Sequence, residues 1–199
     1  MRSPAAGVVL LLAAMLAVGG CTVEVAGTPH AGMTGLRVPP TVQPSGEVFG
    51  DPKGRFELVP PPGWPMGTGS PEGIAVVFAD PEPLPPAITG RFNANINVFV
   101  APTSADLPTT VAGAQQELRG LPGYTPTADE PVTLADGTQA HLIGGEFTNP
   151  GGQLALRNLQ LIAVRSGLAY VVTGTALQQL WDRYEPTFRA SLVSLTVTM

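Results

Sequence analysis

The segment QAHLIGGEFTNPGGQLALRNLQLIAVRSGLAYVVTGT, residues 139–175, decides the fold of this chain. Turn-forming residues at 149–152 and 165–167 divide it into three apolar runs of strand length. The strands are expected at residues 139–148, 153–164 and 168–175. The connections between them are too short for the crossovers that parallel strands need, so the segment predicts an antiparallel meander.

Further strands are predicted before this segment, where apolar residues alternate with polar ones or form short runs. They are expected at residues 55–59, 74–79, 93–100 and 132–134. The last of them forms a hairpin with residues 139–148 across the turn sequence Ala135-Asp136-Gly137-Thr138. Prolines at 60–62 end the first strand, and we expect Trp64 to turn back onto the core.

Two helices are predicted, one before and one after the meander. The first has Asp106 as its N-cap and ends at Gly120. The second has a capping box formed by Thr175 and Gln178. We expect Pro186 to kink or divide the second helix. The apolar face of that helix contains Leu177, Leu180, Trp181, Tyr184 and Phe188.

The order of strands, helix, meander and helix predicts an α+β domain, in which an antiparallel β-sheet is flanked by helices. This domain is expected at residues 55–199. The preceding residues 21–54 are rich in proline and glycine and show no sustained period. We expect them to form a flexible tether.

The N-terminus carries signals for export and lipid attachment. Residues 5–18 are uncharged and apolar, which suits the core of a signal peptide and is short for a membrane-spanning helix. Gly19, Gly20 and Cys21 resemble a bacterial lipobox, with Val18 as a mild departure from it. We therefore expect residues 1–20 to be removed and Cys21 to carry the lipid that anchors the protein to a membrane outside the cytoplasm. Ordinary cleavage that leaves a free cysteine is the alternative.

Composition excludes some classes of function. The formal net charge is −5, and Lys53 is the only lysine, so the chain has no basic stripe and we exclude nucleic acid as a partner. Cys21 is the only cysteine, so the fold has no intramolecular disulfide.

No motif for catalysis, metal or cofactor binding is found. His141 is the only histidine of the expected domain, and Ser70 lacks the G-x-S-x-G pattern of a nucleophile elbow. Structural zinc needs four Cys or His ligands. The acidic pairs Asp129-Glu130 and Asp182/Glu185 are interpreted as solvated charges. The protein is therefore expected to be no enzyme, with no cofactor.

Several motifs together resemble the mycobacterial LpqN/LpqT lipoprotein family. They are the lipobox and tether, FELVPPPGW at residues 56–64, NINV at residues 95–98, and YVVTGT at residues 170–175 leading to the helix with Trp181. The resemblance covers residues 55–195 and implies a Mog1/PsbP-like α/β sandwich without enzymatic activity. Members of the family are regarded as cell-envelope binding proteins, some of them connected with trehalose glycolipids and the export of mycolic lipids.

Large aromatic side chains are the candidate ligand-binding residues. Those singled out are Trp64, Tyr170, Trp181 and Tyr184. One hypothesis is that they line a groove between sheet and helix that binds an acyl chain or glycolipid, and the alternative is that they form the core. A second function, a protein-interaction module that scaffolds an envelope complex or contacts a host protein, requires an exposed apolar patch.

Overall fold

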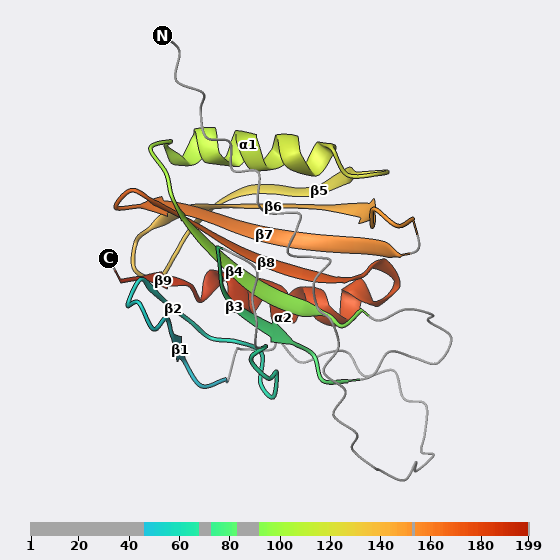
Figure 1. Ribbon diagram of the computed structural model, residues 1–199, viewed down its shortest axis with the longest axis horizontal. Coiled ribbons are helices and arrows are strands. Elements are labelled where there is room, and N and C mark those ends of the chain that lie inside the picture. The colour runs from blue at the N-terminus through green and yellow to red at the C-terminus, as the bar shows by residue number, and fades with distance from the viewer. Residues whose placement is uncertain (1–45, 68–72, 83–91, 153, 199) are drawn as a thin grey trace.

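The computed structural model describes residues 46–67, 73–82, 92–152 and 154–198. The predicted signal peptide, Cys21 and most of the predicted tether lie outside these residues. The described residues form a sheet of six strands, a small sheet of three strands and two α-helices (Figure 1). Neither of these two helices combines the length and the apolar character needed to cross a membrane.

The larger sheet is antiparallel and has the strand order β3-β4-β8-β7-β6-β5. Its strands are β3 (Ile74–Ala79), β4 (Asn95–Pro102), β5 (Thr125–Thr133), β6 (Gln139–Thr148), β7 (Ala155–Arg165) and β8 (Leu168–Leu177). The predicted meander is confirmed, because β6 pairs with β7 and β7 pairs with β8 across short turns.

Strand β5 is longer than the strand predicted at residues 132–134, and it contains Pro126 and Pro131. Proline lacks the N–H that a ladder needs, so in sheets it occurs at edges and bulges. β5 lies at the edge of the larger sheet, and the register shifts between Pro126 and Ala128. Its edge position therefore explains why a segment with two prolines extends the sheet.

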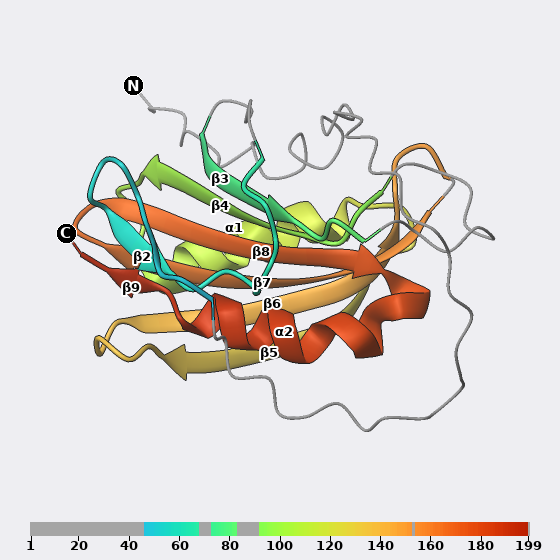
Figure 2. The ribbon, with the colours of Figure 1, turned by 90° about the horizontal axis from the view of Figure 1, so that it is seen from below.

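The two helices cover opposite faces of the larger sheet. α1 (Leu107–Arg119) packs on one face, and α2 (Trp181–Val193) packs on the other together with the small sheet. The small sheet consists of β1 (Phe49–Gly50), β2 (Phe56–Leu58) and β9 (Thr196–Val197). Figure 2 shows α2 in front of the strands and α1 behind them. We call the two sides of the larger sheet the α1 face and the α2 face.

The predicted cap of α1 is confirmed, since a carboxylate oxygen of Asp106 accepts a hydrogen bond from the N–H of Thr109 at 2.9 Å. The predicted capping box of the second helix is wrong. Thr175 lies in β8 because it is paired on both sides, with Asn95 of β4 and Asn158 of β7.

The predicted helix start at residue 175 is therefore displaced. Strand β8 continues to Leu177, and a 3-10 turn at Gln178–Leu180 leads into α2. Pro186 does not divide α2, which runs without a break from residue 181 to 193. The first four N–H groups of any helix have no partner within the helix, and Pro186 is the sixth residue of α2. The missing N–H of this proline therefore removes one hydrogen bond near the start of the helix, and the helix continues beyond it.

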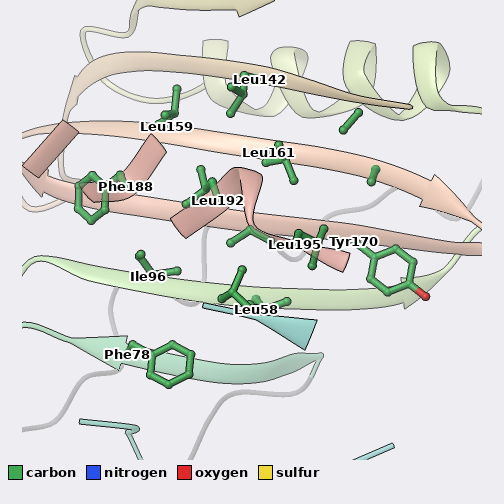
Figure 3. Close-up of a cluster of buried hydrophobic side chains, with 14 of the residues drawn as sticks. Leu58, Phe78, Ile96, Leu142, Leu159, Leu161, Tyr170, Phe188, Leu192 and Leu195 are labelled. Atoms are coloured by element: carbon green, nitrogen blue, oxygen red, sulfur yellow. The ribbon is translucent and has the colours of Figure 1, made fainter. Parts of the chain in front are cut away.

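The core on the α2 face is predominantly apolar. Alternate residues of β8, namely Tyr170, Val172, Gly174 and Ala176, point into it. The ring of Phe188 lies against Gly174, where a β-carbon would come within 2.6 Å of the ring. Figure 3 shows this core with Leu58, Phe78, Ile96, Leu142, Leu159, Leu161, Tyr170, Phe188, Leu192 and Leu195.

The folded part begins earlier than the expected boundary at residue 55. Phe49 and Gly50 form β1 and pair with β2. The next residue, Asp51, is buried and accepts two hydrogen bonds from the guanidinium of Arg55, at 2.6 and 3.0 Å. Residues 49–51 were expected in the tether because the strand is too short to produce a visible period. The expected boundary at residue 55 therefore lies too late, because the fold already includes residues 49–51.

We expect Asp51→Asn to lower the free energy of unfolding by about 2 kcal/mol at neutral pH, because a hydrogen bond to a charged group is lost. The hydrogen bonds from Arg55 hold the pKa of Asp51 below its usual range. A carboxylate with a lowered pKa stabilises the fold above its unfolded pKa, about 3.9, and this contribution disappears as the pH falls through the folded pKa. Urea unfolding measured between pH 7 and pH 2 should therefore give free energies of unfolding for wild type and variant that become equal at acid pH. A difference that stays constant over this range would contradict the assignment.

Candidate ligand-binding site

Three of the four predicted aromatic residues lie together on the α2 face. The rings of Trp64, Trp181 and Tyr184 surround Phe188, with centroids 6.1, 5.6 and 5.8 Å from its ring. Trp181 and Tyr184 are buried, and Trp64 is half-buried. Burial raises the pKa of Tyr184, and so does the hydrogen bond that its hydroxyl donates to Asp80 at 2.6 Å.

Tyr170, the fourth predicted residue, lies apart from this cluster. It is fully buried beside Phe56, with the ring centroids 6.5 Å apart. Figure 3 shows it at the opposite end of the core from Phe188. In this structure the four aromatic side chains contact one another or other core residues. A ligand at this position would have to displace rings that are already packed.

The α1 face of the sheet has a different character, because polar side chains lie in the middle of it. Thr173 of β8 is opposite Asn97 of β4 on one side and Gln160 of β7 on the other. In the next row, Thr175 of β8 is opposite Asn158 of β7. Residues directly opposite each other in such ladders have β-carbons about 5 Å apart. We call these five neighbouring residues, Asn97, Asn158, Gln160, Thr173 and Thr175, the polar stripe.

The polar stripe is buried, and much of its hydrogen-bonding capacity is unused. Thr173, Thr175, Asn158 and Gln160 are each at most 2% exposed. Both threonine hydroxyls, the side-chain nitrogen of Asn158 and the side-chain oxygen of Gln160 have no hydrogen-bond partner among the described residues. A buried polar group without a partner costs about 1–3 kcal/mol. Buried polar groups of native folds are normally paired, so a cluster of four such atoms calls for partners, ordered water or a ligand, that the described residues do not supply.

One further unpartnered oxygen lies on α1. Glu117 Oε2 is buried and has no partner in the described part of the chain, and burial raises the pKa of this carboxyl. Gln115, on the other side of the helix, reaches the edge strand β5 by donating a hydrogen bond to Asp129 at 3.2 Å. Residues 115 and 117 lie about 160° apart around a helix with 3.6 residues per turn. Glu117 therefore faces away from the edge strand, toward the middle of the sheet.

Tyr124, after the end of α1, packs beside one end of the polar stripe. Its ring covers Gly145, where a β-carbon would lie 2.2 Å from a ring carbon, and its hydroxyl donates to the carbonyl of Gly144 at 3.2 Å. The N–H of Gly145 donates to the side-chain oxygen of Asn158 at 3.1 Å. Only glycine at position 145 allows this approach. The contacts fix the oxygen of Asn158 and leave its NH₂ group as the unpartnered part.

The sequence offered one signal for the polar stripe. Asn158 and Gln160 in β7, like Thr173 and Thr175 in β8, are polar residues two apart in mostly apolar strands. Central strands that are buried on both faces are normally apolar throughout. Polar pairs at this spacing in such strands therefore mark a buried polar face.

The remaining candidates from the sequence are placed elsewhere. His141 Nε2 lies 2.6 Å from an exposed carboxylate oxygen of Asp129 in β5, away from the polar stripe. Ser70 lies outside the described residues. Over residues 46–67, 73–82, 92–152 and 154–198, no group of three or more His, Cys, Asp or Glu side chains is arranged to hold a metal ion.

Comparisons with known proteins bear on the fold. No family model matches the chain, and no curated protein matches its sequence. Solved structures are similar to it. LpqN of Mycobacterium tuberculosis, which is involved in cell envelope biogenesis, matches with a TM-score of 0.56 and 18% sequence identity. This match covers 72% of the present chain and 83% of the LpqN chain. The cyanobacterial PsbP of Synechocystis has a TM-score of 0.52 at 18% identity, covering 85% of this chain and 99% of its own. The chain has the Mog1/PsbP-like α+β fold. The fold that the sequence resemblance implied is therefore confirmed.

Proposed function

We propose that this protein is a non-enzymatic, lipid-anchored binding protein of the cell envelope, and that its polar stripe holds the uncharged headgroup of a glycolipid. The observation that carries the proposal is the set of four unpartnered polar atoms on Asn158, Gln160, Thr173 and Thr175. Membership of the LpqN/LpqT lipoproteins is part of the proposal, and LpqN itself is involved in cell envelope biogenesis.

The chemistry of the polar stripe suits sugar hydroxyls. Asn158 offers N–H donors, Gln160 offers an acceptor, and the two threonine hydroxyls can do either. A sugar hydroxyl also donates and accepts, so it can satisfy both kinds of group. The stripe contains amides and hydroxyls and no basic side chain, which disfavours phosphate or carboxylate headgroups. The unpartnered oxygen of Glu117 on α1 is a further acceptor on the same side of the sheet.

Apolar rows border the polar stripe at both ends, which suits a ligand that also carries acyl chains. On one side the next row contains Phe99, Val171 and Ile162, and on the other it contains Leu177 and Leu156. All five side chains belong to the apolar core on the α1 face. Apolar walls with a few convergent polar groups are the usual composition of a small-molecule site.

The predicted lipid on Cys21 supports a location at the membrane, where a glycolipid is available. Between Cys21 and the start of the described residues at 46 the chain is rich in proline and glycine. Several acyl chains on one cysteine give stable attachment.

A protein-interaction module is the second candidate, and two side chains favour it. Val48 and Met66 are 56% and 58% exposed. Val48 precedes Phe49 in the chain, Met66 pairs with Phe78 through a β-bridge, and the rings of Phe49 and Phe78 are in edge contact at 5.4 Å. Exposed apolar side chains at this end of the fold can contribute to a surface that receives an envelope or host protein.

Native mass spectrometry of the protein with three ligands tests the proposal. We expect dodecyl maltoside, which has a neutral sugar headgroup and an alkyl chain, to bind more tightly than maltose alone or dodecanoate alone. Trp64→Ala should leave this binding unchanged, because Trp64 lies on the α2 face. Equal binding of dodecanoate and dodecyl maltoside would contradict a headgroup site and favour an acyl-chain carrier. Loss of binding in Trp64→Ala would move the site to the aromatic cluster.

A further inference from the structure

A second pair of unsatisfied groups lies on the α2 face, at the junction of β7 and α2. The guanidinium carbon of Arg157 lies over the indole ring of Trp181, 4.8 Å from the ring centroid. Trp181 is 2% exposed, and the side chain of Arg157 is 23% exposed. The guanidinium that carries the donor Arg157 Nε is therefore in contact with the ring that carries the donor Trp181 Nε1.

Both donors are buried and lack an acceptor among the residues that the structure describes. Glu146 does not supply one, because its carboxylate lies 3.5 Å from the terminal nitrogen Nη1 of Arg157 and accepts a hydrogen bond from Gln178 at 2.7 Å. The acidic side chain therefore occupies the outer end of the guanidinium. The inner edge, with Nε, is left to another acceptor.

The start of α2 adds to the positive character of this position. Trp181 is the first residue of α2, and the N-cap residue Leu180 has an apolar side chain that cannot accept a hydrogen bond. The N-terminal end of a helix carries a partial positive charge that favours anions. A guanidinium thus lies over the indole ring of the first residue of a helix.

We propose that Arg157 and Trp181 bind an oxyanion, with one phosphate or carboxylate oxygen accepting from Arg157 Nε and another from Trp181 Nε1. Guanidinium groups form their strongest hydrogen bonds with such oxygens. The oxyanion belongs either to a soluble anion or to the headgroup of an anionic lipid in the membrane. Two oxygens on one phosphorus or carbon atom satisfy both donors at once.

This site is separate from the polar stripe. Arg157 and Asn158 are adjacent in β7, so their side chains point to opposite faces of the sheet. The pairing confirms this, since Arg157 is opposite Glu146 and Ala176, whereas Asn158 is opposite Gly145 and Thr175. A result that contradicts the glycolipid proposal therefore does not contradict the oxyanion site, and the reverse also holds.

The indole N–H resonances provide a direct test, because the chain has two tryptophans. We would record ¹H–¹⁵N spectra of the full chain in neutral detergent during titration with inorganic phosphate, assigning the two signals with Trp64→Phe. We expect a saturable downfield shift of the Trp181 signal while the Trp64 signal stays in place. A second titration, in vesicles of phosphatidylcholine with and without phosphatidylglycerol, identifies a lipid headgroup as the source when phosphatidylglycerol alone produces the shift.

Two variants and one control complete the test. Arg157→Gln should weaken binding by roughly tenfold, and Arg157→Lys, which keeps the charge but lacks Nε, should weaken it as well. Arg183→Gln is the matched control, because Arg183 lies 5.2 Å over the ring of Tyr184 but its side chain is 52% exposed and pairs with Glu82. Binding in Arg183→Gln should equal that of wild type. The absence of a saturable shift with both phosphate and phosphatidylglycerol, or unchanged binding in folded Arg157→Lys, would overturn the proposal.

Discussion

Phe188→Ala should lower the free energy of unfolding by about 3–5 kcal/mol, the range for truncating a large aromatic residue in a core. Phe188 is 0% exposed and is surrounded by Trp64, Trp181 and Tyr184. Its ring also lies against the backbone of Gly174 in β8, so it joins α2 to the centre of the sheet. Because whole domains are stable by about 5–15 kcal/mol, this single truncation removes a large part of the total.

Urea unfolding followed by far-ultraviolet circular dichroism measures the effect, and Phe188→Leu provides the control. Leucine keeps most of the apolar volume, so we expect a loss of less than about 2 kcal/mol. Gly174→Ala should also destabilise, since the added methyl group meets the ring of Phe188. A loss below about 1 kcal/mol for Phe188→Ala would show that α2 is not held on the sheet by this residue.

The combined change of Thr173→Val and Thr175→Val should affect stability and binding in opposite directions. Valine has the shape of threonine, and these hydroxyls have no partner within the described residues. We therefore expect the free energy of unfolding to stay the same or to rise by up to about 2 kcal/mol. Affinity for dodecyl maltoside should fall about tenfold, since each lost hydrogen bond is worth about 0.5–1.5 kcal/mol.

Ser191→Ala serves as the contrasting control. Ser191 is fully buried like the two threonines, but its hydroxyl donates to the carbonyl of Val59 at 2.7 Å. Its removal should cost about 1–3 kcal/mol and leave ligand binding unchanged. If the double valine variant lost as much stability as Ser191→Ala, the threonine hydroxyls would be structural and the polar stripe would not be a binding site.

Much of the sheet could be predicted from the sequence because its signals are local. The turn at residues 165–167 places Ser166 and Gly167 at φ values of 52° and 74°, and such turn geometry joins β7 to β8 directly. Asp106 is a similar case, since its cap depends on a residue three positions away. Local chemistry of this kind is visible in a single sequence.

The misplaced elements depend on tertiary neighbours. Pro126 and Pro131 are tolerated because β5 is an edge strand, and the sequence does not show which strand lies at the edge. Thr175 and Gln178 have the spacing of a capping box, yet pairing with β4 and β7 keeps Thr175 in the sheet. In each case a long-range contact overrides a local preference.

The site was predicted from large aromatic residues, which do not distinguish a groove from a core. Trp181 and Tyr170 would have the same sequence context in either setting, and in the structure both are buried. Asn97 shows the converse, since it lies on the polar side of the alternating strand β4 and is nevertheless only 7% exposed. Whether a polar side chain in a strand meets water or another layer depends on what covers that face.

The side-chain NH₂ signal of Asn158 provides the most direct test of the proposed ligand site. In ¹H–¹⁵N spectra recorded during titration with dodecyl maltoside, we expect this signal to shift and saturate, because its nitrogen lacks a partner among the described residues. The indole signals of Trp64 and Trp181 should stay in place, since both rings lie on the α2 face. A saturable shift of the indole signals with an unchanged Asn158 signal would place the ligand among the aromatic residues and contradict a site on the α1 face.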